Sequence, residues 1–382
     1  MKLVVIDPHV TSKSPSIRAW VGAFPLIRDL FEEVEIWASE CDVPEGNGVV
    51  WRRIPQRLPT WTLHAIDFQR RVNRMARALP PDKNRLVQAT GCVVPVADIR
   101  YIQYWNCALL EEQAARPETF PLPLTKKLPA MLAARQEAAA VAASRPGDDW
   151  WVVSRSLAER IRSQGAAGHF GILPNEYDPE RFNTGVRDEW REPMREHYGF
   201  QPNERVLVFS AFGHFERKGL RQAVEAIEKL RQNGHPVRFL ILGGNPATVH
   251  RFRKTLTPSQ QDGCVFAGLV DSIERHLVAA DGLLFPSHFE AFSLAEIEAA
   301  ALGLRLYLTP HYGSEMILRE PANGRLLPWD PAGMAETIAM EITEGTLGKS
   351  HSELAEAISK DSYVERLRHL FQAAIRRKSF EL

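Results

Sequence analysis

Two carboxylates, Glu290 and Glu298, stand with seven residues between them where the sequence pattern changes from strand to helix. The apolar run 281–288 precedes Glu290 and ends in a Pro-Ser turn, which predicts a strand followed by a loop. The residues after Glu290 are rich in Ala, Leu and Glu and predict a helix. The sequence therefore places Glu290 on a loop and Glu298 two turns into a helix.

The start of this predicted helix is a candidate anion site. The first N–H groups of a helix have no partners within it, and together with the helix dipole they attract anions such as phosphate. These N–H groups belong to Ala291, Phe292, Ser293 and Leu294. Glu298 would then accept hydrogen bonds from hydroxyl groups, such as those of a ribose. The alternative is that Glu290 stabilises the helix start and that Glu298 is a solvated helix residue.

A second motif, Phe212-Gly-His-Phe-Glu-Arg-Lys-Gly219, lies between a predicted strand and a predicted amphipathic helix. A lysine fixed at such a junction can meet a diphosphate and stabilise negative charge as a leaving group departs. The helix dipole disfavours Arg217 and Lys218 near a helix start, so a bound anion explains these cations better than an ordinary surface position does.

Four further motifs carry a resemblance to a known family. They occur in the family's order, at Phe266–Asp271, Pro286–Glu290, His311–Glu315 and Asn323–Leu327. With them, the segment Val265–Leu327 resembles the C-terminal half of the family 4 retaining glycosyltransferases, which have the GT-B fold. The Phe-x-Arg-Lys-Gly form around Lys218 is similar to that of the lipopolysaccharide-core members. Two positions depart from the family pattern, because Gly213 stands where many members have Arg and Asn106 where many have His. Either Arg217 or His214 would supply the charge missing at Gly213.

The resemblance implies roles for these residues. Glu290 would orient the hydroxyls of a donor sugar, Lys218 with Arg217 would stabilise the departing diphosphate, and Glu298 would hold the ribose. The residues expected nearer the base and the cleft are Gly244, Leu269, Val270 and Asn175. Turn chemistry explains Gly244 equally well. UDP is the favoured nucleotide, with GDP and ADP as alternatives, and neither a metal nor a further cofactor is expected.

Fold class and domains follow from length and pattern. A chain of 382 residues exceeds the usual size of one core, and strand-like runs alternate with helical ones, which predicts two α/β domains. Strands are expected at 3–7, 34–37, 101–105, 150–154, 205–210 and 238–242, and helices at 16–32 and 220–233. The resemblance adds that two Rossmann-like, doubly wound domains, 1–185 and 200–350, face a central cleft. A linker is expected at 182–204, and a final helix at about 360–378 is expected to pack on the first domain.

Composition narrows the partners and the compartment. Lys plus Arg and Asp plus Glu both total 47, so nothing calls for a nucleic acid. The four cysteines are scattered without metal-ligand spacing, which favours reduced thiols in the cytoplasm. The apolar run at the N-terminus is too short for a signal peptide, and no run is long enough to span a membrane.

The N-terminal half offers weaker candidates for an acceptor site. Ser12, Lys13 and Ser14 stand where many family members carry a glycine-rich loop, and Asn106 could donate a hydrogen bond nearby. Alternatively, Ser14 or Ser16 merely caps the following helix. The stretch 116–129 and the Ala-rich helix 130–143 are expected to form an insertion or lid.

The segment 52–85 concentrates positive charge, with nine Lys or Arg against two Asp, and Trp51 and Trp61 lie near its start. An anionic membrane surface or a phosphorylated glycan would suit it, whereas a solvated basic helix is the alternative.

The sequence as a whole therefore predicts a retaining glycosyltransferase. It would move a hexose from a nucleotide sugar to a glycan or glycolipid acceptor in cell-envelope polysaccharide or lipopolysaccharide synthesis. Two alternatives stay open, namely a non-catalytic scaffold that binds nucleotide sugar and a nucleotide-sugar epimerase of the same fold.

Overall fold

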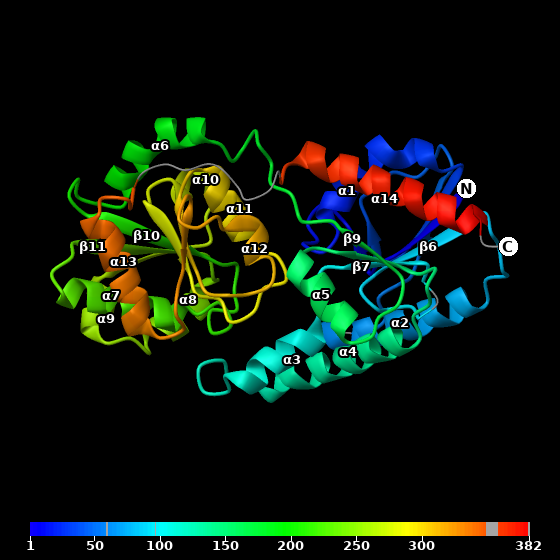
Figure 1. Ribbon diagram of the computed structural model, residues 1–382, viewed down its shortest axis with the longest axis horizontal. Coiled ribbons are helices and arrows are strands. Elements are labelled where there is room, and N and C mark those ends of the chain that lie inside the picture. The colour runs from blue at the N-terminus through cyan, green and yellow to red at the C-terminus, as the bar shows by residue number, and fades with distance from the viewer. Residues whose placement is uncertain (59, 96, 349–357, 381–382) are drawn as a thin grey trace. The chain divides into compact units, whose positions relative to one another are not determined.

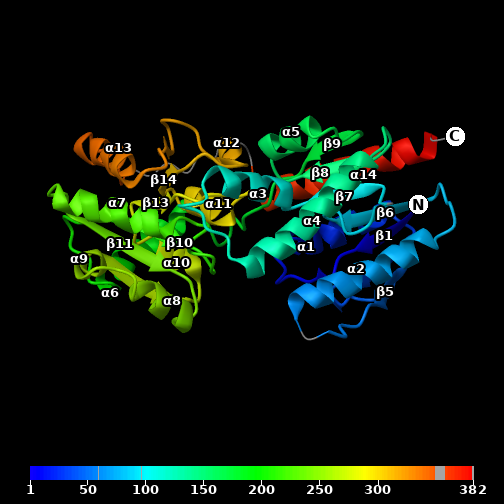
Figure 2. The same ribbon diagram turned by 90° about the horizontal axis from the view of Figure 1, so that it is seen from below.

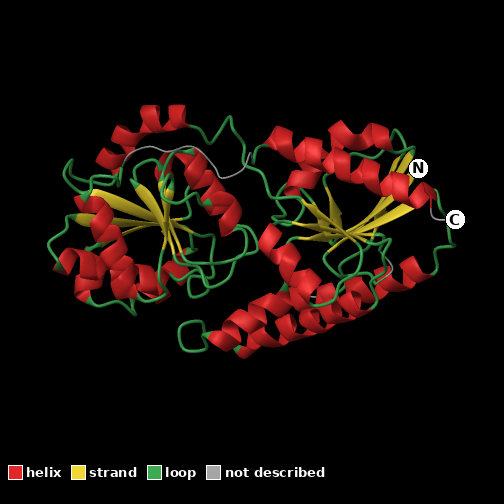
Figure 3. Ribbon diagram, viewed as in Figure 1, coloured by secondary structure: helices red, strands yellow, loops and turns green. Residues whose placement is uncertain are grey.

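The computed structural model describes residues 1–58, 60–95, 97–348 and 358–380, and it divides into two compact units (Figure 1). Unit 1 comprises the described residues of 1–114, 122–176 and 360–382, and unit 2 those of 115–121 and 177–359. Each unit consists of a parallel sheet with helices on both faces (Figure 3). The chain is thus α/β throughout, as the alternation of its patterns predicts.

Unit 1 contains a seven-stranded parallel sheet in the order β5-β3-β1-β6-β7-β8-β9. Its strands are β1 (Lys2–Ile6), β3 (Glu33–Ala38), β5 (Val49–Arg53), β6 (Arg85–Thr90), β7 (Ile99–Ile102), β8 (Asp149–Val152) and β9 (His169–Ile172), and a small pair is formed by β2 (His9–Val10) and β4 (Glu40–Cys41). The chain adds strands outward from β1 on one side and then from β6 on the other, which is the doubly wound arrangement.

The helices of unit 1 cover both faces of this sheet. They are α1 (Arg18–Ile27) with the 3₁₀ turn η1 (Arg28–Leu30), α2 (Trp61–Arg77), α3 (Asn106–Ala115), α4 (Leu124–Ala142), α5 (Arg155–Ser163) and α14 (Lys360–Phe380). One buried cluster joins the sheet to α1 and α14, and a second joins it to α2. No helix in the described ranges is both long and apolar enough to cross a membrane.

The final helix, α14, belongs to unit 1, as expected, and runs beside α1 (Figure 1). Its apolar residues recur at helical spacing, and Tyr363, Leu367 and Phe371 are at most 2% exposed. The ring of Phe371 meets that of Trp151 edge-on at 4.7 Å, and Tyr363 Oη lies 3.1 Å from Tyr101 Oη. A sequence-distant helix is therefore part of the core of unit 1.

Unit 2 contains a six-stranded parallel sheet in the order β12-β11-β10-β13-β14-β15. Its strands are β10 (Arg205–Ser210), β11 (Val237–Leu242), β12 (Cys264–Gly268), β13 (Gly282–Phe285), β14 (Arg305–Leu308) and β15 (Gly324–Leu326). Its helices are α6 (Thr184–His197), α7 (Leu220–Gln232), α8 (Pro246–Arg253), α9 (Pro258–Asp262), α10 (Ile273–Leu277), α11 (Leu294–Ala301), α12 (Ser314–Ile317) and α13 (Pro331–Thr343). In Figure 1, α7, α8, α9 and α13 lie on one face and α6, α10 and α11 on the other.

The expected linker at 182–204 is instead occupied largely by α6, which is part of unit 2. Three arginines of α6 donate hydrogen bonds to the segment between α10 and β13 of the same unit. Arg191 donates to Ala280 O at 2.7 Å and to Asp281 Oδ1 at 2.6 Å, while Arg187 and Arg195 donate to neighbouring carbonyl groups. The division between the units therefore falls at 176/177, earlier than the boundary of 185 expected from the sequence. The reason is that these arginines donate hydrogen bonds to carbonyl groups of unit 2 instead of lying in solvent.

Candidate functional site

The candidate site lies where the loops after β10 and β13 meet. These strands are parallel neighbours, so their carboxyl ends share one edge of the sheet. Two close approaches hold the loops together. The His288 N–H donates to Arg217 O at 2.9 Å, and a Cβ on Gly219 would lie only 2.0 Å from Pro286 O. Gly219 also has a φ of 74°, so both its backbone conformation and its surroundings require glycine.

Glu290 is the centre of the charged contacts at this junction. Its Oε1 lies 2.7 Å from Lys218 Nζ and 3.0 Å from Arg217 Nη1, and it accepts a hydrogen bond from Ser287 Oγ at 2.8 Å. The side chains of Glu290 and Lys218 are only 9% and 16% exposed. The carboxylate thus binds the cations of the neighbouring loop, and Arg217 provides positive charge in the motif that has Gly213 in place of the family's arginine.

These contacts set the ionisation of the pair. Burial by itself raises the pKa of Glu290, but the charges of Lys218 and Arg217 outweigh burial and lower this pKa to about 2. Burial lowers the pKa of Lys218, and the charge of Glu290 opposes that shift. Glu290 is therefore a carboxylate at neutral pH that can accept hydrogen bonds, next to two groups that can only donate them.

The loop that contains Glu290 leads into α11, and Glu298 lies in that helix, half-buried. Ala291 and Phe292 are buried ahead of the helix, and Ser293 is its N-cap residue. Ser293 Oγ is buried and has no hydrogen-bond partner in the described part of the chain. The loop-then-helix placement predicted for the two carboxylates is thus what the structure shows, with polar groups turned inward at the helix start.

Sequence reasoning missed two ionisable residues beside this cluster. Glu296 on α11 has a fully buried side chain, and His311 on the loop after β14 has a side chain that is 1% exposed. Glu296 Oε1 lies 3.0 Å from His311 Nε2. Both residues lie in segments that the sequence analysis names, because Glu296 stands between Glu290 and Glu298 and His311 begins the motif His311–Glu315. Nothing local in the sequence pairs this acidic residue with a histidine fifteen positions later.

Segment 115–121, part of the expected insertion, packs on unit 2 beside the same loop. The ring of His288 stacks between those of Phe120 and Trp329, at 5.3 and 5.4 Å between centroids. Arg116 lies over Trp329 and donates to His288 O at 3.2 Å. Burial first, and then the charge of Arg116, lower the pKa of His288 to about 4, so His288 is neutral at neutral pH.

Comparison with known proteins finds a family match for part of the chain. Residues 203–343 match the family of group 1 glycosyl transferases, and this range contains Arg217, Lys218, Glu290, Glu296, Glu298 and His311 but not Arg116. The match covers 141 of the 382 residues, all of them in unit 2. The amylovoran biosynthesis glycosyltransferase AmsK of Erwinia amylovora is 27% identical over 203 residues, which is 50% of this chain and 47% of AmsK. The alignment therefore spans about half the length of that relative.

Solved structures match along nearly the whole chain and show the GT-B fold. Sucrose-phosphate synthase of Thermosynechococcus elongatus gives a TM-score of 0.71 at 16% identity, covering 98% of this chain and 99% of its own. WaaG, a glycosyltransferase of lipopolysaccharide biosynthesis, gives 0.66 at 16% identity, covering 97% and 95%. HepE of Anabaena, in complex with UDP-glucose, gives 0.66 at 14% identity, covering 98% and 100%. The GT-B fold that the resemblance implied is confirmed.

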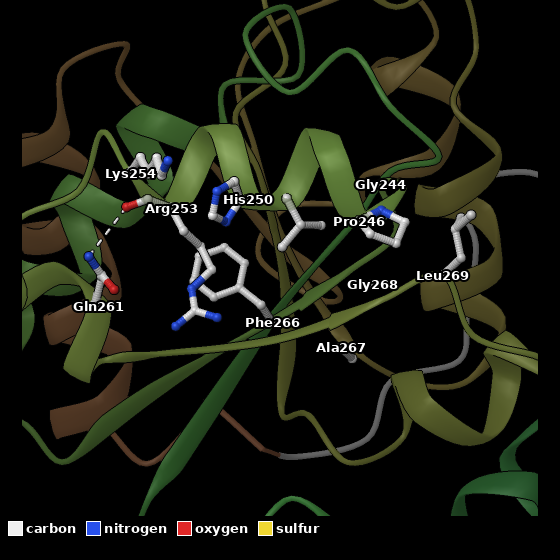
Figure 4. A pocket seen from close by; sticks show the side chains of 11 residues that line it. Gly244, Pro246, His250, Arg253, Lys254, Gln261, Phe266, Ala267, Gly268 and Leu269 are labelled. Atoms are coloured by element: carbon white, nitrogen blue, oxygen red, sulfur yellow. Dashed lines mark hydrogen bonds between the residues drawn. The ribbon is translucent and has the colours of Figure 1, made fainter.

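A cavity of about 710 Å³ lies between α8 and the edge strand β12 of unit 2 (Figure 4). Gly244 and Leu269 line one end, whereas Val270 is not among the lining residues. At the other end Arg253 lies over the ring of Phe266, 5.3 Å from its centroid. Gly244 has a φ of 78° and a Cβ there would lie 2.6 Å from Phe215, so turn geometry requires this glycine whether or not a base binds beside it.

The candidate acceptor residues all lie in unit 1 and mostly bond within it. Ser12 donates to Asp42 Oδ2 at 2.8 Å from both its N–H and its Oγ, and Asn106 Nδ2 donates to Glu137 Oε1 at 2.8 Å. Ser14 Oγ lies 3.1 Å from Ser16 Oγ. The alternative that Ser14 or Ser16 caps the next helix is wrong, because the N-cap residue of α1 is Ile17 and no side-chain capping hydrogen bond is formed there.

Two further predicted residues of unit 1, Lys13 and Asn175, are described by their exposure and their place in the chain. Lys13 is exposed beside Ser12, and Asn175 is 8% exposed, directly before the chain leaves unit 1. The side chain of Trp61 lies outside the described residues, whereas Trp51 donates from Nε1 to Ala38 O at 3.0 Å. Within the described ranges, no group of three or more His, Cys, Asp or Glu is arranged to hold a metal ion.

Proposed function

We propose that this protein is a retaining glycosyltransferase that moves a hexose from a nucleotide diphosphate sugar to a hydroxyl group of a glycan or glycolipid. The observation that supports this proposal most directly is the contact of Lys218 and Arg217 with Glu290 at the start of α11. Two cations and a buried carboxylate at the carboxyl edge of a parallel sheet suit a ligand that has both phosphates and hydroxyls.

The charge of each side chain determines the part of the donor that it binds in this proposal. Lys218 and Arg217 donate hydrogen bonds to the diphosphate and stabilise the charge that grows on it as the sugar departs. Glu290, held as a carboxylate, accepts hydrogen bonds from the sugar hydroxyls and fixes the ring over the loop. Arg217 is anchored for this task because its Nη1 also donates to Phe289 O at 2.5 Å. Glu298, further along α11, holds the ribose. Retention of configuration follows front-face attack assisted by the leaving phosphate, with no enzymic nucleophile.

The relatives support the donor and the pathway class. HepE binds UDP and UDP-glucose in its solved structures, which favours UDP as the nucleotide here. AmsK acts in amylovoran biosynthesis and WaaG in lipopolysaccharide biosynthesis, which favours an acceptor of the cell envelope. The donor site needs no metal in this proposal, since the diphosphate charge is met by the two basic side chains. The four cysteines are free, in keeping with a reducing cytoplasm.

An acceptor on a membrane is favoured by a surface of unit 1. The exposed side of α4 has large apolar residues at 40–72% exposure, namely Leu124, Leu128, Met131 and Leu132. Lys126, Lys127 and Arg135 lie on the same helix. Figure 2 shows α2 and α4 as two long helices of this unit. An apolar stripe with flanking cations suits the surface of an anionic membrane, so we include peripheral contact on the cytoplasmic face in the proposal.

A thermal-shift panel tests the donor site. UDP, GDP and ADP, each bare and linked to glucose, galactose, N-acetylglucosamine or mannose, are added to wild type, Lys218→Ala and Lys229→Ala. Lys229 lies exposed on α7 and is the matched control. A ligand at about 100 times its dissociation constant adds roughly 2.7 kcal/mol of stability. We expect one donor to stabilise wild type and Lys229→Ala but not Lys218→Ala.

The other outcomes separate the alternatives. Absence of a shift with every donor would contradict the assigned donor site. Conversion of the bound donor without any acceptor would identify an epimerase. Donor binding with no turnover on envelope glycans or glycolipids would favour the scaffold.

A further inference from the structure

A second buried ion pair lies at the first turn of α11, the helix that follows Glu290. Glu296 and His311 come from different elements, α11 and the loop after β14, and their facing atoms are 3.0 Å apart. The loop is fixed against the start of α11 because a Cβ on Gly313, which has a φ of 87°, would lie within 3.1 Å of Ala291 O and of Phe292. His311 is therefore held beside the residues that begin the donor-binding helix.

The geometry makes His311 a cation. Its Nδ1 lies 3.1 Å from Tyr312 O, and a carbonyl oxygen only accepts, so Nδ1 carries a hydrogen. Its Nε2 faces the Glu296 carboxylate. In a neutral ring, Nε2 would direct a lone pair at this negative charge, which is unfavourable, so Nε2 also carries a hydrogen. Burial by itself lowers the pKa of His311, but the charge of Glu296 and then that of Glu290 outweigh it and raise this pKa to about 9.

Compared with apolar residues of similar size, the pair is poorly explained as a source of net stability. The Glu296 oxygens and His311 Nε2 face each other without the alignment of a hydrogen bond, and none of these atoms has another hydrogen-bond partner in the described ranges. Apolar residues of similar size often replace such buried pairs at no loss, or with a gain, in stability. A buried charge pair in this position therefore suggests a role in the neighbouring site.

The pair is electrically coupled to the donor site. The charge of Glu290 helps to raise the pKa of His311, the charge of His311 helps to lower that of Glu290, and the charge of Glu296 acts on Lys218. Together with Arg217, the cluster has three cations and two carboxylates. It therefore has one positive charge in excess before any ligand binds, which suits an anionic leaving group.

We propose that Glu296 and His311 are positioning residues for the donor: Glu296 keeps His311 as an imidazolium, and His311 holds Glu290 and the start of α11 in the arrangement that receives a nucleotide diphosphate. This inference rests on the proposed function. A cation fixed in a dry site needs no reorganisation when charge develops on the leaving phosphate, so its removal affects turnover more than donor affinity.

The first test measures the charge of His311 without requiring activity. Imidazole resonances of the whole protein are followed by NMR from pH 6 to 10, and His311 is assigned by its absence in His311→Gln. We expect His311 in wild type to remain protonated at pH 8 and to become neutral on mutation of Glu296 to Gln. A neutral His311 at pH 7 in wild type would overturn the inference.

The second test measures nucleotide release by the double variant Glu296→Gln/His311→Gln, with Glu296→Leu/His311→Leu as the version least prone to unfold. We expect kcat to fall at least roughly tenfold with a smaller change in KM for the donor. In wild type kcat should decline as pH rises through 9, and the variants should lose that decline. Burial also lowers the pKa of Lys218, so only the part of the decline that the variants lose is assigned to His311.

The matched control is another buried ion pair of unit 2, Arg305 with Glu341. Arg305 is the first residue of β14, whereas His311 follows the other end of this strand. Its replacement by Met and Leu should leave kcat and its pH profile unchanged. A folded double variant at Glu296 and His311 with wild-type kcat and pH profile would overturn the inference alone. Absence of nucleotide release from every donor by wild type would overturn the proposed function, and the inference with it.

Discussion

The candidate polar residues of the two units differ in the partners that they bind. In unit 2, Glu290 shares one carboxylate oxygen between Lys218 and Arg217, so the cations retain donor groups for a further anion. In unit 1, Ser12 and Asn106 donate to Asp42 and Glu137 of the same unit. In unit 2, charge is therefore concentrated at one edge of the sheet. In unit 1, the candidate polar groups donate hydrogen bonds to other residues of the same unit.

This difference explains why motifs point to the proposed donor site more readily than to an acceptor site. A diphosphate demands cations and free N–H groups at a sheet edge, and few arrangements supply them. An acceptor can be met by many surfaces, such as the exposed apolar side of α4, and such a surface leaves little trace in a motif.

The largest expected effect compares the two units directly. Lys218→Ala should lower kcat by about 100-fold or more, because it removes a preorganised cation from the developing charge. Asn106→Ala should change kcat by less than about 3-fold and cost roughly 1–2 kcal/mol of stability, because Glu137 loses a hydrogen bond. Steady-state kinetics and urea unfolding measure both. Equal losses of kcat in the two variants would break the comparison.

The next effect tests the approach of the two loops. Gly219→Ala should destabilise unit 2 by roughly 2–4 kcal/mol, because the methyl group would collide with Pro286 O and the left-handed backbone disfavours it. The matched control is Gly234→Ala, which also has a positive φ, 84°, but has no atom near the added Cβ. It should cost about 1 kcal/mol. Thermal unfolding that ranks the two glycines equally would contradict the role given to this contact.

The ion pairs predict a pH dependence of stability that is specific to unit 2. The pKa of Glu290 is lowered in the folded state, so its contribution is full above the ordinary value of 4.5 and is lost as pH falls towards 2. The pKa of His311 is raised, so its contribution is full below 6.5 and is lost as pH rises through 9. Each contribution is on the order of 2–3 kcal/mol.

Urea midpoints from pH 3 to 10 measure both limbs. Glu290→Gln should weaken the acid limb and His311→Gln the alkaline one. Profiles identical to wild type would show that these charges are uncoupled from folding.

The smallest effect concerns the surface of unit 1. Leu128→Ser should reduce binding to vesicles containing anionic lipid by about 3-fold to 10-fold, and stability should stay within about 0.5 kcal/mol because the side chain is 57% exposed. Vesicle sedimentation measures the binding. Leu326→Ser, an equally conservative change at an exposed leucine of unit 2, is the control. Equal binding by both variants and wild type would remove α4 from the proposed membrane surface.

Local patterns predicted much of the fold of unit 2. The strand at 205–210 has the same bounds in the structure, and the helix expected at 220–233 is α7, at Leu220–Gln232. These elements are determined by short-range apolar periodicity, which the sequence displays directly. In unit 1 the expectations omitted β5 and β6, whose central residues mix apolar and polar types. The stretch at α6 was expected to be a linker because its arginines indicate solvent exposure, whereas the structure buries Arg187 and Arg195 against carbonyl groups.

The sequence by itself determined the α/β class, the loop-and-helix placement of Glu290 and Glu298, and the basic turn at Lys218, because each depends on neighbours in the chain. Only the tertiary structure decided that Lys218 and Arg217 meet the same oxygen of Glu290, that Glu296 pairs with His311, and that segment 115–121 packs on unit 2. Those contacts join residues far apart in the chain, and their energy depends on burial, which removes the competing water and exists only once the sheet has assembled.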